Sequence, residues 1–249
     1  MTLLAVTLTQ LTDGIFLIRM QDQEHKNTFS PALLSGLMTC FAGVREHPDA
    51  RVVILTGYDN YFSTGGTKES LLALQHTQGN FTDANVYSLA LECPLPVISA
   101  MQGHAIGGGL VMGLFSDLII MSQESIYAAN FMKYGFTPGM GATLILPLRL
   151  GDYLALEMLY TSRNYRGEEL ARRGAAFEVL PRDKVLTRAV EVAQMLAEKP
   201  RHTLTLFKAH MTRQLRTGLD EIIKKELEMH AKTMHHPDVL ERIERLFGN

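Results

Sequence analysis

The sequence has few of the residues that build disulfide frameworks, redox pairs or metal clusters. Only two of its 249 residues are cysteine, and it contains no tryptophan. Cys40 and Cys93 lie in separate apolar stretches, without the spacing of a metal site or of a redox motif. We therefore expect two buried, unpaired thiols in a reducing compartment.

Long apolar runs and an excess of one charge are also missing. No apolar stretch approaches the roughly 20 residues that a membrane span needs, so no membrane partner is expected. The 24 Lys and Arg residues against 26 Asp and Glu give a formal net charge of -2, which offers no basic field for nucleic acid. The N-terminal residues lack the basic segment and small-residue cleavage site of a signal peptide. These absences favour a soluble, cytoplasmic protein.

The first two thirds of the chain alternate between strand and helix patterns. A helix is predicted to begin at Ser30-Pro31, because serine caps free amides and proline suits the first helical position. The alternation predicts an α/β fold with parallel strand pairing. The apolar stripe expected on that helix comprises Leu33, Leu34, Leu37, Met38 and Phe41. The expected strands cover 4–11, 15–20 (joined to the first by a turn at Asp13-Gly14), 51–56, 96–101 and 118–121.

Helices dominate the chain from residue 153 onward. They are expected over 153–161, 167–173, 184–198, 203–216 and 219–234, with a short one after Pro237. We therefore predict a core over 1–198 and a C-terminal helical region over 199–249. This region is expected to pack on the core or on a neighbouring subunit.

Two glycine-containing loops are candidates for chemistry. One is 61–68 (Tyr-Phe-Ser-Thr-Gly-Gly-Thr-Lys), and the other is 103–109 (Gly-His-Ala-Ile-Gly-Gly-Gly), which enters an apolar helix. Neither carries a phosphate-binding or dinucleotide-binding signature. Tight turns are the simpler interpretation of each loop alone. Facing one another, their amides would form an oxyanion hole for charge on a carbonyl oxygen.

Together with the segment 137–143 (Thr-Pro-Gly-Met-Gly-Ala-Thr), these loops resemble the crotonase (enoyl-CoA hydratase/isomerase) superfamily. The resemblance covers essentially the whole chain. It implies a spiral of ββα units followed by a helical region that builds trimers, often paired into hexamers. It also implies that the amides of Gly66 and Gly108 form the oxyanion hole.

The two glutamates that hydratases of this family use are absent. The matching positions here are Val111 and Phe131, which cannot move a proton. Their apolar side chains are expected to line the acyl pocket. A poorly solvated pocket with an oxyanion hole suits decarboxylation, because the carboxylate loses its hydration while the enolate charge is stabilised.

Three further segments, 56–62, 131–141 and 229–233, look like the decarboxylating crotonase homologues of polyketide β-branching cassettes, of the curacin, bacillaene and mupirocin type. That resemblance implies a 3-methylglutaconyl thioester on an acyl carrier protein as substrate and a 3-methylcrotonyl-type product. The phosphopantetheine arm would belong to the substrate, and no metal or redox cofactor is implied. Coenzyme A as the carrier stays open.

His230 is the predicted general acid. It shares an apolar helical stripe with Ile223, Leu227 and Met234, a pattern that by itself is more typical of a packed core histidine. The resemblance places the catalytic histidine of the subgroup here, and a pKa near neutrality suits protonation of a dienolate carbon. The competing candidate is His104 in the second glycine loop. His235 and His236 are expected to be solvated at a helix end.

The carboxylate site departs from the subgroup pattern. Decarboxylases of this type often have a lysine where this chain has Asn80, which donates hydrogen bonds without a charge. Lys68 is an alternative cation, although a solvated loop lysine is its simpler role. Thr67 and Tyr87 are candidates for orienting the carboxylate. Tyr134 is interpreted equally well as a packing residue and as a functional one. The resemblance places Lys26 where coenzyme A-using relatives contact the nucleotide, so it would meet phosphopantetheine or the acidic carrier surface here; a solvated basic turn explains it equally well.

Two other functions stay open from the sequence. One is an enoyl-CoA hydratase or isomerase in which His230 or His104 moves the proton. The other is a catalytically degenerate trimeric scaffold or RNA-binding protein. The intact glycine loops argue against degeneracy, and the near-neutral charge argues against RNA.

Overall fold

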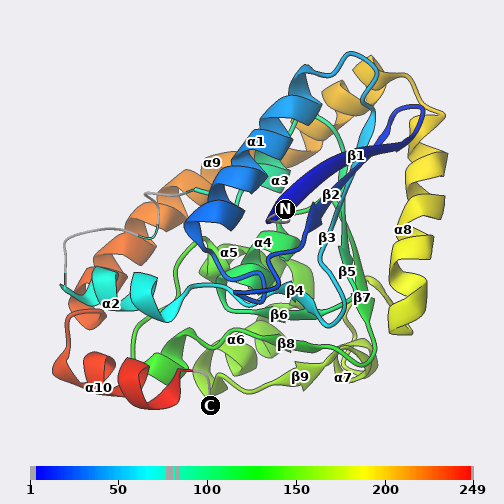
Figure 1. Ribbon diagram of the computed structural model, residues 1–249. Coiled ribbons are helices and arrows are strands. Elements are labelled where there is room, and N and C mark those ends of the chain that lie inside the picture. Colours follow the sequence, from blue (N-terminus) through cyan, green and yellow to red (C-terminus); the bar gives the residue numbers. More distant parts are fainter. Residues whose placement is uncertain (1–3, 77–80, 82–84, 248–249) are drawn as a thin grey trace.

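The computed structural model describes residues 4–76, 81 and 85–247 (Figure 1). Two sheets lie at its centre, and the longest helix, α9 (Arg201–Thr233), runs along one side of them. The larger sheet has six strands in the order β1-β2-β3-β5-β7-β10; β1 and β2 are antiparallel and all other neighbours are parallel. Its strands are β1 (Val6–Thr12), β2 (Ile15–Met20), β3 (Val52–Thr56), β5 (Val97–Met101), β7 (Leu118–Ser122) and β10 (Glu178–Leu180).

A second sheet of four short strands has the order β4-β6-β8-β9. Its strands are β4 (Tyr61–Ser63), β6 (His104–Ile106), β8 (Ile126–Ala128) and β9 (Tyr165–Arg166). Each turn of the chain adds one strand to each sheet and then a helix: β3, β4 and α2 (Lys68–His76), then β5, β6 and α4 (Gly108–Leu114), then β7, β8 and the 3-10 helix η1 (Phe131–Tyr134). The expected spiral of ββα units is thus confirmed.

The larger sheet is buried on both faces, which explains why its central strands are almost entirely apolar. On β3, Val52 and Ile54 face the helix α8 (Arg182–Ala197), whereas Val53 and Leu55 face the main core and α1 (Pro31–Glu46). The two helices therefore cover opposite faces (Figure 1). The Oγ of Ser30 accepts the amide of Leu33 at 3.2 Å and caps α1, as predicted.

The C-terminal half of the chain is helical, as expected. The remaining helices are α3 (Leu89–Glu92), α5 (Ala142–Leu150), α6 (Asp152–Thr161), α7 (Gly167–Arg172) and α10 (Pro237–Leu246). The prediction of separate helices over 203–216 and 219–234 is wrong, because α9 continues through Gly218. A glycine inside a helix costs about 1 kcal/mol, and buried contacts of Thr212 and Leu219 on either side outweigh it.

Two smaller predictions also need correction. Met38 is 45% exposed rather than part of the buried stripe of α1, whose buried positions shift to Cys40 and Val44. Strands β4 and β6 occupy parts of both predicted glycine loops. By contrast, both cysteines are buried and free, as expected.

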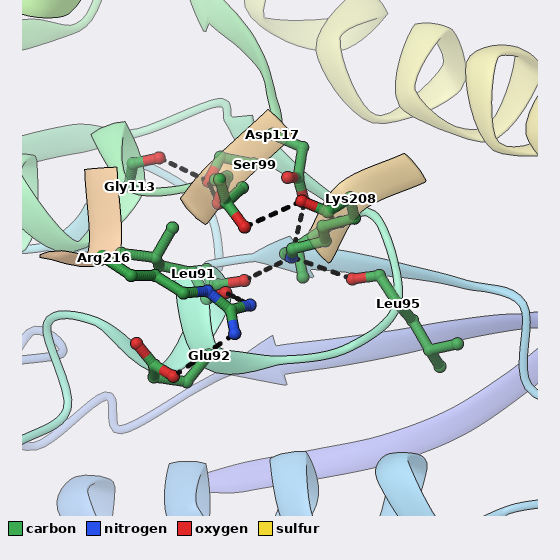
Figure 2. Close-up of polar contacts among 12 residues, drawn as sticks. Leu91, Glu92, Leu95, Ser99, Gly113, Asp117, Lys208 and Arg216 are labelled. Atoms are coloured by element: carbon green, nitrogen blue, oxygen red, sulfur yellow. Dashed lines mark hydrogen bonds and ion pairs between the residues drawn. The ribbon is translucent and has the colours of Figure 1, made fainter. Parts of the chain in front are cut away.

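A buried lysine fastens the first half of α9 to the core (Figure 2). Lys208 is 4% exposed, and its Nζ donates to the carbonyl oxygens of Ala90 at 2.7 Å and Leu95 at 3.0 Å and to the Asp117 carboxylate at 2.7 Å. Arg216, two turns further along, donates to the carbonyl of Leu91 at 2.6 Å. The helical region therefore packs on the core, while the division at residue 198 stays a prediction.

Candidate active site

The two glycine loops lie directly against each other. Gly65 has a φ of +78°, and a Cβ there would lie 2.6 Å from the carbonyl oxygen of Ile106 and 3.2 Å from the amide nitrogen of Gly108. The Gly65 carbonyl oxygen accepts the amide of Phe29 at 2.7 Å. Only glycine satisfies both the backbone conformation and this close approach.

The amides of Gly66 and Gly108 are available at this junction. Gly108 is the first residue of α4, so its N–H belongs to the free first turn of a helix. Within the described ranges, no acceptor is found for the amide of either Gly66 or Gly108. Two free N–H groups on adjoining loops can stabilise a developing oxyanion.

Asn27 fixes the first loop, and the sequence analysis missed this residue. Its buried side-chain amide donates to the carbonyl oxygens of Met20 at 3.1 Å and Phe62 at 3.0 Å, and its own carbonyl accepts the Ser63 hydroxyl at 2.8 Å. Asn27 and the preceding Lys26 both have a φ of +53°, a conformation that asparagine tolerates better than most residues. The Lys26 ammonium lies 5.9 Å from the ring centre of Tyr61.

The segment 137–143 connects the oxyanion loops to His230. A Cβ on Gly108 would lie 2.7 Å from the sulfur of Met140, and a Cβ on Gly139 would lie 2.6 Å from the ring of Phe81. Phe81 in turn meets the imidazole of His230 edge to face, with ring centroids 5.4 Å apart. A continuous set of contacts therefore joins the second glycine loop to His230.

His230 lies in an aromatic environment with one nitrogen unpaired. Its Nδ1 lies 3.2 Å from the carbonyl oxygen of Thr137, and Phe136 packs on the ring with centroids 5.4 Å apart. Its Nε2 is buried and has no hydrogen-bond partner among the residues described. In the neutral ring Nδ1–H donates to Thr137, which leaves Nε2 to exchange a proton. Burial lowers the pKa of His230, and the bond to Thr137 opposes this only in part.

Apolar side chains occupy the positions of the hydratase glutamates. Val111 is fully buried on α4, and Phe131 is buried with its ring edge-on to Phe136, 6.5 Å between centroids. Tyr134 stacks on Phe136 at 6.1 Å and contacts Phe247 at 5.9 Å, contacts that are typical of a packing residue. Neither Val111 nor Phe131 carries a group that can donate or accept a proton.

A buried glutamate lies one helical turn before His230 and was not anticipated. The Glu226 carboxylate accepts the amides of Gly141 at 2.7 Å and Thr143 at 2.9 Å and the Thr143 hydroxyl at 2.6 Å, so it caps α5. Burial raises its pKa, and these donors counter the shift. The available sequence signal was its i, i+4 spacing from His230.

The predicted carboxylate-binding residues have different surroundings. Thr67 Oγ1 accepts the amide of Ser70 at 2.9 Å and caps α2, which leaves its proton free to donate. Tyr87 is buried against Phe115, and burial raises its pKa to about 12. Asn80 lies outside the described residues, although the next residue, Phe81, contacts His230. Lys68 begins α2.

The other histidines lie outside this set of contacts. His104 accepts the amide of Ile126 through Nδ1 at 3.0 Å, and its ring meets Tyr61. Burial, together with nearby arginines, lowers its pKa. His235 and His236 are exposed, as expected, and the ring of His236 caps α10.

Among the described residues, no three His, Cys, Asp or Glu side chains are arranged to hold a metal ion. None of the helices within those ranges is both long and apolar enough to span a bilayer.

The spiral fold thus carries two adjoining glycine loops whose free amides are suited to binding an oxyanion. The chain belongs to the enoyl-CoA hydratase/isomerase family, whose model matches residues 10–246. It is 55% identical over 249 residues, all of both chains, to the bacillaene synthase decarboxylase PksI of Bacillus subtilis.

Two solved structures have closely similar folds. One, described as part of a dehydratase/decarboxylase enzyme couple involved in polyketide beta-branching, is 54% identical with a TM-score of 0.97 and covers 98% of this chain and 100% of its own. The ECH2 decarboxylase domain of CurF from Lyngbya majuscula is 45% identical, with a TM-score of 0.94 and the same coverage. The predicted family and subgroup are confirmed.

Proposed function

We propose that this protein is a decarboxylase of polyketide β-branching. Its substrate would be a 3-methylglutaconyl-type thioester on an acyl carrier protein, and its product a 3-methylcrotonyl-type thioester. The full-length similarity to decarboxylases supports this reaction class. The observation that carries it is the unpaired Nε2 of His230. This imidazole lies among aromatic side chains whose contacts lead to the second glycine loop, in a chain where Val111 and Phe131 stand at the positions of the hydratase acid and base.

The amides of Gly66 and Gly108 would bind the thioester oxygen. As the bond to the carboxylate breaks, carbon dioxide leaves and the electron pair moves through the conjugated system onto that oxygen, giving a dienolate. Protonated His230 would then deliver its Nε2 proton to a dienolate carbon, while its Nδ1–H stays bound to Thr137. Solvent afterwards restores the proton on His230.

The carboxylate would be held by neutral donors in a poorly hydrated pocket. Asn80, the Thr67 hydroxyl and the Tyr87 phenol are the proposed donors, with Val111 and Phe131 limiting access of water. The raised pKa of Tyr87 keeps its phenol protonated, which suits a donor. Neutral donors stabilise the carboxylate of the bound substrate less than a cation would.

The proposed partner is an acyl carrier protein, whose phosphopantetheine arm carries the thioester; coenzyme A is the alternative carrier. The protein itself would need no cofactor. A cytoplasmic location stays a prediction.

We also propose assembly into a homotrimer, or a hexamer of two trimers. Large apolar side chains are exposed on two separate helices, and in a ring one such face of each subunit can meet the other face of the next. The Tyr160→Asp substitution is therefore expected to lower the mass measured by light scattering, and an unchanged mass would exclude this face. The exposed residues are Tyr153, Leu156 and Tyr160 on α6 and Leu206, Phe207 and Met211 on α9.

The deciding experiment is mass spectrometry of a 3-methylglutaconyl-loaded carrier protein after incubation with the enzyme. Loss of the mass of carbon dioxide is the expected result. An unchanged mass would contradict the proposal. Addition of water to an enoyl-CoA would instead assign hydratase activity.

A further inference from the structure

One face of α9 is bound to the segment 137–143 at three places. Glu226, His230 and Thr233 follow one another at i, i+4 and i+7, so they lie on the same side of the helix. Each makes a hydrogen bond to this segment, and His230 is the middle one of the three. The segment is therefore held on both sides of the imidazole.

Glu226 holds the C-terminal end of the segment. Its carboxylate is 1% exposed and accepts three hydrogen bonds, from the amide of Gly141 and from the amide and hydroxyl of Thr143. Glutamine could not reproduce this arrangement, because its NH2 group would face one of these donors. The site therefore specifically requires a carboxylate.

Thr233 holds the N-terminal end. Its Oγ1 lies 3.2 Å from the amide nitrogen of Thr137, 3.0 Å from the Thr137 hydroxyl and 3.2 Å from the carbonyl oxygen of His230. The Thr137 amide donates to Thr233 Oγ1, and the two hydroxyls bond each other with either as donor. The backbone carbonyls of Met229 and His230 are the other acceptors within reach of the Thr233 proton. The residue whose carbonyl binds His230 Nδ1 is thus fixed by Thr233.

The same segment also reaches the oxyanion loop. Met140 has a φ of +64° and Gly141 a φ of +80°, so two successive residues adopt the left-handed conformation. Methionine is rarely found there, and the bond from Glu226 to the Gly141 amide helps to hold this turn. Met140 in turn contacts Gly108, whose amide would bind the thioester oxygen.

We propose that Glu226 and Thr233 are positioning residues, which set the His230 imidazole and the Gly108 amide in one fixed geometry. Neither residue touches the substrate in this proposal. It rests on the proposed role of His230 in protonating the dienolate. Loosening either tether changes the distance between the proton donor and the oxyanion hole.

The test compares Glu226→Gln and Thr233→Val with two control variants on the same helix. Glu228→Gln removes an exposed carboxylate from α9. Thr217→Val removes an exposed hydroxyl that bonds the carbonyl four residues earlier, at 3.1 Å, without reaching the segment 137–143. Thr233→Ser keeps the tethering hydroxyl and serves as the rescue variant.

Two readouts are needed. The first is kcat and KM for decarboxylation of the loaded carrier protein; we expect kcat to fall about 10- to 100-fold, with KM nearly unchanged, for a displaced catalytic group. The second is the Cε1–H resonance of His230 in protein labelled with 13C-histidine, assigned with His230→Gln. This resonance should shift in Glu226→Gln and Thr233→Val and stay in place in both controls and in Thr233→Ser.

The resonance separates this inference from the proposed function. If the wild-type protein does not decarboxylate the loaded carrier protein, the proposed function is wrong. The chemical shift of the His230 resonance still tests whether Glu226 and Thr233 position the imidazole. An unshifted resonance with unchanged kcat in Thr233→Val would overturn the inference. If Glu226→Gln does not fold, Thr233→Val and its rescue by Thr233→Ser decide the matter.

Discussion

The Nδ1 of His230 lies 3.2 Å from the carbonyl oxygen of Thr137, and this pairing determines which nitrogen of the ring can react. A carbonyl oxygen only accepts, so Nδ1 keeps its proton in both charge states of the ring. Nε2 carries a proton only when the imidazole is charged. The proposed general acid is therefore the imidazolium form.

Activity should accordingly fall as the pH rises through the His230 pKa. Burial lowers this pKa below the ordinary value of 6.5, so the charged form is lost at a lower pH than for a solvated histidine. We expect kcat/KM to decrease toward alkaline pH with an apparent pKa below 6.5. A pH–rate profile from about pH 5 to pH 8 checks this, and a profile in which activity rises over that range would contradict it.

Replacing His230 by alanine should reduce turnover by about 100-fold or more, which is a typical loss for a general acid. The oligomer should remain intact. Decarboxylation followed by mass spectrometry and molecular mass by light scattering measure the two effects. His202→Ala, which changes an exposed histidine at the start of α9, is the matched control. Wild-type turnover in His230→Ala would remove this residue from the mechanism.

The two proposed oxyanion glycines should respond differently to an added methyl group. A Cβ on Gly108 would lie 2.7 Å from both the Met140 sulfur and the ring of Phe29, so the loop must move. We expect Gly108→Ala to lower kcat by about 100-fold. At Gly66 the nearest side-chain atom, on Leu71, is 3.5 Å away, and a much smaller loss is expected. Equal losses of kcat for Gly66→Ala and Gly108→Ala in single-turnover assays would contradict this steric explanation.

Lys208→Met should destabilise the fold. It leaves the carbonyl oxygens of Ala90 and Leu95 without this buried donor and the Asp117 carboxylate with the Val97 amide but without its cation, and removing one partner of a buried pair costs about 3–5 kcal/mol. Lys225→Met breaks an exposed pair with Glu221 on the same helix, and because solvent screens this pair, the free energy of unfolding should change far less than in Lys208→Met. Urea unfolding of both variants measures the difference, and similar losses would argue against a special role for Lys208.

Five of the six strands of the larger sheet could be predicted, because each has five or more residues with an apolar or alternating pattern, whereas β10 has only three residues and was missed. Residues 52–56 and 97–101 form uninterrupted buried runs, and the sequence places both strands within a residue or two. The second sheet was missed because its strands have only two or three residues, too few to show a period. Strands β4 and β6 were therefore interpreted as parts of glycine loops.

The candidate site residues came from two sources in the sequence. The glycine loops were proposed from their motifs and His230 from the family resemblance, whereas Glu226 was overlooked because its partner Gly141 lies 85 residues away in sequence. Asn27 was overlooked for the same reason, since it holds Phe62, 35 residues further on. Such contacts depend on the completed fold and leave no local pattern.

The continuity of α9 makes it a rigid strut between two parts of the molecule. Lys208 fastens one end of this helix to the core, and His230 lies 22 residues further along, about 33 Å at a rise of 1.5 Å per residue. Two helices joined by a hinge would allow the histidine to move independently of that anchor. Because α9 is a single helix, the distant imidazole is also restrained by the packing around Asp117. Any subunit that covers the exposed residues near Lys208 restrains it in the same way.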